Sequence, residues 1–95
     1  MIILHVTFRT HPGKAEEFVQ SVLGAGIAKD SEAEDGNGYY DFYYSAEQED
    51  EVMLLEQWES QEALDKHCLQ PHYKRIGDIK EKYVQHTDIV KYEVK

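Results

Sequence analysis

The chain is poor in cysteine and in basic residues, and both shortages exclude whole classes of protein. One cysteine among 95 residues rules out an internal disulfide framework. Only 10 lysines and arginines stand against 19 aspartates and glutamates, which gives a formal net charge of -9. Nucleic acids and anionic membrane surfaces attract proteins of the opposite charge. We therefore expect neither as a partner.

Long apolar runs are also missing. No stretch approaches the roughly 20 apolar residues that a membrane-spanning helix requires. The opening segment MIILHVTFRT is apolar for only a few residues and lacks a basic region and a cleavage site, so we expect no signal peptide. Together with the single cysteine, this predicts a cytoplasmic protein.

Several catalytic motifs are absent as well. The chain has no glycine-rich phosphate loop, no nucleophile elbow and no Cys-x-x-Cys pair, so nothing supports nucleotide binding or covalent catalysis. His67 and His72 are five residues apart across Pro71, rather than four apart on one helix face. This spacing suits a metal site with Glu56 poorly. We predict no metal and no cofactor.

The residues that are present follow two clear periodicities. Alternation predicts strands and 3.6-residue spacing predicts helices. The expected strands are 2–10, 39–45, 52–59 and 84–94, and the expected helices are 14–31, one after Ser60 and one from Pro71. The order β-α-β-β-α-β predicts one domain, 1–95, with the ferredoxin-like α+β fold: a four-stranded antiparallel sheet with helices on one face.

The face of the sheet that the helices leave bare is also expected to be apolar. We assign to it Tyr39, Tyr43, Met53, Leu55 and Ile89. An apolar surface of this extent usually marks an interface. We therefore predict a homodimer with the two sheets packed face to face.

The central stretch LLEQWESQEALDKHCLQPHYKRI, residues 54 to 76, carries the candidate site. Glu56 shares a strand face with Leu54 and Trp58, where an unpaired carboxylate would be costly. It is either held in a buried hydrogen bond or ion pair, with His67 for example, or it is an acid or base with a shifted pKa.

The two histidines and the aromatic residues also allow two readings. His67 lies on the inward stripe of its helix and His72 begins the next one, so each either satisfies a backbone group or lines a pocket. Trp58 is either core packing or a flat wall for an aromatic ligand. The candidate catalytic residues are His67, His72 and Glu56, and the candidate substrate-binding residues are Trp58, Tyr40, Phe42 and Tyr73.

Four segments together resemble a known family. They are HPGKAEEF (11–18), EDGNGYYDFYYS (34–45), LLEQWES (54–60) and EALDKHCLQPHYK (62–74). They resemble the antibiotic biosynthesis monooxygenase (ABM) domain of the dimeric α+β barrel proteins, over nearly the whole chain. The resemblance implies a dimer with a ligand pocket between sheet and helices in each subunit. It also implies cofactor-free oxidation of phenols or quinols by O2.

The resemblance favours one function and leaves two others open. The favoured function is a cofactor-independent monooxygenase of a small hydroxylated aromatic, quinol-like compound, with His67 or His72 as base and Trp58 stacked on the ring. The first alternative is an isomerase of a small phosphorylated sugar-like signal molecule, which needs the base but no O2. The second is a dimeric ligand-binding module without catalysis. Haem-degrading relatives use an Asn, a Trp and a His at positions that correspond roughly to Val6, His67 and Gly77. None of these three residues matches, so the resemblance does not extend to haem degradation.

Overall fold

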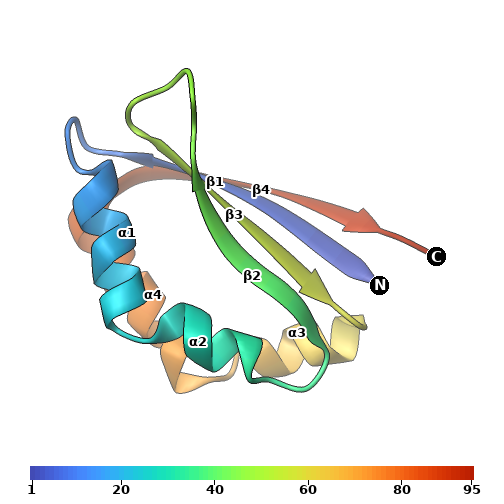
Figure 1. Cartoon of the computed structure of the whole chain (residues 1–95). Helices are drawn as coiled ribbons and strands as arrows, with labels where there is room; N and C mark the ends of the chain where they lie inside the picture. Colours follow the sequence, from blue (N-terminus) through green and yellow to red (C-terminus); the bar gives the residue numbers. More distant parts are fainter.

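The computed structural model describes residues 1–95 as one antiparallel sheet with all helices on one of its faces (Figure 1). Its elements are β1 (Ile2–Thr10), α1 (Ala15–Gly24), α2 (Ile27–Glu32), β2 (Asn37–Tyr44), β3 (Glu51–Trp58), α3 (Gln61–His67), α4 (Pro71–Tyr83) and β4 (Val84–Glu93). The predicted ferredoxin-like α+β fold is confirmed. None of the helices is both long enough and apolar enough to cross a membrane.

The sheet has the strand order β2-β3-β1-β4, so β1 and β3 form its centre. Leu4 of β1 lies opposite Glu56 of β3, and Phe8 lies opposite Val52. Directly opposed residues of antiparallel strands point to the same side of the sheet. This register therefore fixes one row of side chains that faces the helices, with Glu56 at one end and Phe8 towards the other.

The helix expected over 14–31 is two helices. α1 ends at Gly24, and Gly26 adopts a left-handed backbone with a φ of 74° before α2 begins. A residue with a β-carbon is strained in that conformation, whereas glycine is not. The break redirects the chain, so that α2 packs against β2 and α4 rather than continuing along α1.

The helical region after β3 is also divided in two. Ser60 caps α3, its hydroxyl oxygen accepting a hydrogen bond from the backbone N–H of Ala63 at 3.1 Å. Pro71 then occupies the first turn of α4, where its missing N–H costs nothing. His67 therefore ends one helix and His72 begins the next, and both are buried.

The outer strand β4 corrects one assignment made from the sequence. Ile89 was predicted on the face away from the helices, but it lies opposite the buried Val6 and so points to the helix side. Val90 and Tyr92, opposite His5 and Ile3, lie on the far face instead and are exposed. The far face remains apolar, and the homodimer through it remains a prediction.

Candidate functional site

A cavity of about 310 Å³ lies between the sheet and the helices α3 and α4. Most of its wall is aliphatic or aromatic, with Leu4, Val6, Phe8, Leu54, Leu64 and Ile76 among its residues. Polar groups are the minority: Glu56, His67, Tyr40 and Tyr73 gather on one part of the wall, and Gln61, Asp65, Lys80 and Thr87 also line the cavity. A mostly apolar pocket with a few convergent polar groups is typical of a small-molecule site.

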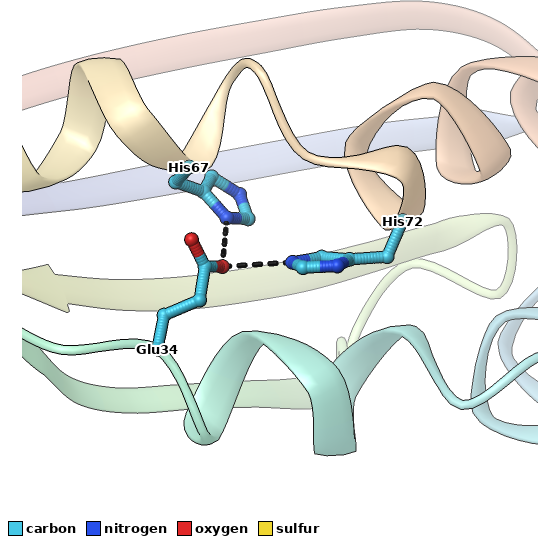
Figure 2. Close-up of side chains that lie close together, drawn as sticks. All are labelled: Glu34, His67 and His72. Carbon is cyan, nitrogen blue, oxygen red and sulfur yellow. Dashed lines mark hydrogen bonds and ion pairs between the residues drawn. The ribbon is translucent and has the colours of Figure 1, made fainter.

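Three side chains converge behind this wall (Figure 2). Glu34, from the turn after α2, points its carboxylate at both histidine rings. Its Oε2 lies 2.6 Å from Nδ1 of His67 and 2.8 Å from Nε2 of His72. An ionised carboxylate can only accept hydrogen bonds, so each of these ring nitrogens carries a proton and donates it.

This arrangement determines which form of His67 faces the cavity. With Nδ1 protonated and held by Glu34, a neutral ring presents a lone pair on Nε2. Burial lowers the pKa of His67, although its hydrogen bond to Glu34 acts in the opposite direction. The net effect is a pKa below the usual 6.5, which favours the neutral ring at neutral pH. Its Nε2 is a base of the kind found in Glu–His and Asp–His pairs.

Glu56 lies next to that lone pair. Its Oε1 accepts a hydrogen bond of 3.1 Å from the indole Nε1 of Trp58, and it lies 3.7 Å from Nε2 of His67. Burial raises the pKa of Glu56 to about 7, and the nearby charge of Glu34 adds to the effect while the Trp58 hydrogen bond opposes it. The 3.7 Å separation exceeds a hydrogen bond, which leaves Nε2 available to a ligand.

Two tyrosines complete this part of the wall. The rings of Tyr40 and Tyr73 meet the ring of His67 edge-on, with centroids 5.8 and 5.4 Å away. Burial raises the pKa of both phenols, and the charge of Glu56 contributes for Tyr40. Both phenols therefore stay protonated; the hydroxyl of Tyr40 lies near Ser31 and that of Tyr73 near Cys68.

Comparisons with known proteins agree with this geometry. The model of the family described as "Antibiotic biosynthesis monooxygenase" matches residues 1–78. The chain belongs to the antibiotic biosynthesis monooxygenase family.

Individual relatives are distant but cover nearly the whole chain. A Bacillus subtilis protein named "Putative monooxygenase YcnE" is 28% identical over 99% of this chain and 98% of its own length. The crystal structure of PA3566 from Pseudomonas aeruginosa has a TM-score of 0.86 at 25% identity, covering 99% of this chain and 94% of that one. A Deinococcus radiodurans structure has a TM-score of 0.88 at 24% identity, covering 100% and 93%; at this identity it shows the fold alone.

The structure brings four of the seven candidate residues to the cavity of this family member. Glu56, His67, Tyr40 and Tyr73 line it. The other three, Trp58, Phe42 and His72, do not line it. The ring of Trp58 is 0% exposed and packs against His67 with centroids 4.5 Å apart, so it supports the imidazole rather than facing the cavity. His72 shares Oε2 of Glu34 with His67, and the centroids of the two imidazole rings are 5.6 Å apart.

Glu34 is the member of this cluster that the sequence reasoning missed. It opens the segment EDGNGYYDFYYS, so the resemblance contained a signal for it. Gly36 holds it in place: its φ is 89°, and a β-carbon there would lie 2.8 Å from Cβ of Ala63. The turn that carries Glu34 can approach α3 this closely only with glycine at that position.

The three residues in Figure 2 are also the set that could hold a divalent cation. One donor atom from each of Glu34, His67 and His72 lies within 4.8 Å of the others. Two imidazole nitrogens and a carboxylate oxygen are suitable ligands for zinc or iron. From the sequence, these two histidines were weighed as metal ligands together with Glu56. In the structure they converge from separate helices on Glu34 instead. The absence of a metal remains a prediction.

Proposed function

We propose that this protein is a cofactor-independent monooxygenase that oxidises a small, quinol-like hydroxylated aromatic with O2. The observation that carries the proposal is His67, a neutral base on the wall of an apolar cavity, with its Nδ1 held by Glu34 at 2.6 Å. Membership of the antibiotic biosynthesis monooxygenase family supports the reaction class.

The first step in this proposal is removal of the phenolic proton. A ligand ring in the cavity presents its hydroxyl to Nε2 of His67, which accepts the proton. The imidazolium that forms is stabilised by Glu34 on the other ring nitrogen. A tyrosine hydroxyl on the same wall, that of Tyr73 or Tyr40, donates a hydrogen bond to the phenolate oxygen.

The second step needs no reductant beyond the substrate. An electron-rich phenolate passes one electron to O2, and the two radicals combine to form a carbon–oxygen bond. At a ring carbon that carried hydrogen, loss of water leaves a carbonyl group. One oxygen atom of O2 enters the product and the other leaves as water, so the phenol supplies all the electrons. The apolar wall keeps bulk water away from these intermediates.

The same features weigh against the alternative of a phosphorylated sugar as substrate. A sugar phosphate requires many hydrogen-bonding groups and several cations, whereas this wall is mostly apolar and its only lysine or arginine is Lys80.

We also propose that the enzyme acts as a homodimer in the cytoplasm. The exposed Tyr43, Val90 and Tyr92 on the far face of the sheet support such an interface.

Oxygen uptake by the purified, metal-stripped protein with a panel of quinols tests the proposal. We expect uptake in the wild type, a loss of about 100-fold or more in His67→Gln, and a smaller loss in His72→Gln. His11→Gln is the matched control, since His11 is exposed in the turn after β1 and does not line the cavity. Wild-type protein that consumes no O2 with any quinol, or a fully active His67→Gln, contradicts the proposal. Binding without uptake would favour the ligand-binding module instead.

A further inference from the structure

The cavity has a second functional end. Lys80 of α4 is the only lysine or arginine on its wall, where the other charged residues are Glu56 and Asp65. Lys80 is partly buried, and no carboxylate lies within 4.0 Å of its Nζ. In a chain with 19 acidic residues, a partly buried lysine without an acidic partner is conspicuous.

The only close partner of the Lys80 ammonium is an aromatic ring. Its Nζ lies 5.5 Å from the centroid of Phe8, within the range of a cation–π contact. Burial lowers the pKa of Lys80, so its charge lacks the stabilisation that water or a carboxylate would give. An anion in the cavity would supply that stabilisation, as it would meet an ammonium that has no competing ion pair.

Two independent elements place Lys80 far from His67. On β1, Leu4 lies opposite Glu56 and Phe8 lies beneath Lys80. These four residues of strand span about 13 Å. On α4, the ring of Tyr73 contacts the ring of His67, and Lys80 follows two turns later on the same helix face. Seven residues of helix span about 10 Å.

Between these two ends the wall is apolar. Val6, Leu54 and Ile76 line the middle of the cavity, and Gly77 adds no side chain there. A β-carbon at Gly77 would meet nothing within 4 Å, so the space beside the helix is open. The cavity therefore suits an elongated, mostly apolar ligand with a polar group at each end.

We infer that Lys80 is an anion-binding subsite, and that the substrate is an elongated hydroxyaromatic compound with one anionic group at the end remote from its hydroxyl. Its hydroxyl meets His67 at one end and its single carboxylate, or equivalent anion, meets Lys80 at the other. The inference rests on the proposed function for the chemistry at the His67 end. One anionic group suits the single cation on the wall and the overall charge of -9.

Calorimetric binding of three naphthalene compounds under nitrogen tests the subsite without turnover. 6-Hydroxy-2-naphthoic acid carries the hydroxyl and the carboxylate at opposite ends, 3-hydroxy-2-naphthoic acid carries them side by side, and 2-naphthol lacks the acid. We expect Lys80→Met to weaken 6-hydroxy-2-naphthoate about tenfold or more. We expect changes of less than about twofold for the other two compounds. Lys80→Arg should retain most of the affinity.

Lys82→Met is the matched control, because Lys82 is exposed on the same helix and does not line the cavity. The inference is overturned if Lys80→Met leaves the affinity for 6-hydroxy-2-naphthoate unchanged, or if Lys82→Met has the same effect. It is equally overturned if Lys80→Met weakens all three compounds alike, or if none of them binds.

The two proposals fail separately. Discrimination that depends on Lys80 in a protein that consumes no O2 leaves the subsite standing and removes the monooxygenase. If oxygen uptake depends on His67 but Lys80→Met does not change the relative affinities for the three naphthalene compounds, the monooxygenase stands and the subsite is removed.

Discussion

Replacing Glu56 by glutamine should remove a large pH dependence from the stability of this protein. Glu56 is 6% exposed, and burial raises its pKa from 4.5 to about 7. A carboxyl whose pKa is raised by folding binds more protons in the folded state than in the unfolded state over that interval. The free energy of unfolding therefore falls as the pH rises from 4.5 to 7.

The size of the effect follows from the shift. A rise from 4.5 to about 7 is about 2.5 pKa units, which at 1.36 kcal/mol per unit amounts to about 3 kcal/mol. Glutamine keeps an oxygen that can accept the hydrogen bond from the Trp58 indole, now 3.1 Å long, but it cannot ionise. Glu56→Gln should therefore be close to the wild type in stability at pH 4.5 and more stable by up to about 3 kcal/mol at pH 8.

Urea denaturation of both proteins, at one protein concentration and several pH values, measures this difference directly. Taking the difference between them cancels the titration of groups that the substitution does not touch. Glu51→Gln is a suitable control, because Glu51 is a less buried residue of the same strand that pairs with Arg9 at the surface. A difference between Glu56→Gln and the wild type that stays constant from pH 4.5 to 8 would refute the assigned shift.

Three further predictions concern the other parts of the site. Glu34→Gln should lower kcat about 10- to 100-fold. It should also move the acid limb of the kcat/KM profile, already expected below pH 6.5, to lower pH, because Glu34 raises the pKa of His67. The control Glu32→Gln, on the exposed side of α2, should leave kcat and the pH profile unchanged. Gly77→Ala should raise the free energy of unfolding by about 0.5–1 kcal/mol, since its β-carbon enters open space in a helix; a loss in urea denaturation would mean that the space is occupied. Dialysis against a chelator should leave oxygen uptake unchanged, whereas a loss restored by added zinc or iron would make Glu34, His67 and His72 a metal centre.

Local patterns in the sequence were enough to predict the strands, their order and the family. The alternation over residues 2–10 matches β1 residue for residue, and the strand predicted at 52–59 is β3 at Glu51–Trp58. These predictions succeed because a strand or helix with one buried face must repeat its apolar residues every two or every 3.6 positions. The buried environment of Glu56 and His67 followed from the same periodicities.

The sequence did not predict the structure correctly where the local spacing of apolar residues fits two arrangements equally well. The apolar spacing continues across Gly26, so it could not show that the backbone turns left-handed there and divides the helix. In β4, Ile89 and Val90 are adjacent and both apolar, and only the pairing of Ile89 with Val6 determines which of them faces the helices. The spacing of five between His67 and His72 was weighed only for a metal site with Glu56, and it did not show that the break at Pro71 lets two helices direct both rings at the carboxylate of Glu34.

The sequence by itself therefore determined the fold, because the periodicity of short segments shows which elements form, and the resemblance of four segments indicated the family. Only the tertiary structure decided the site. Glu34 reaches the histidines from 33 and 38 residues away, and Lys80 lies over Phe8 from the far end of α4. Both contacts depend on how separate elements pack against one another. Packing is a property of register and helix placement, and no local spacing in the chain encodes it.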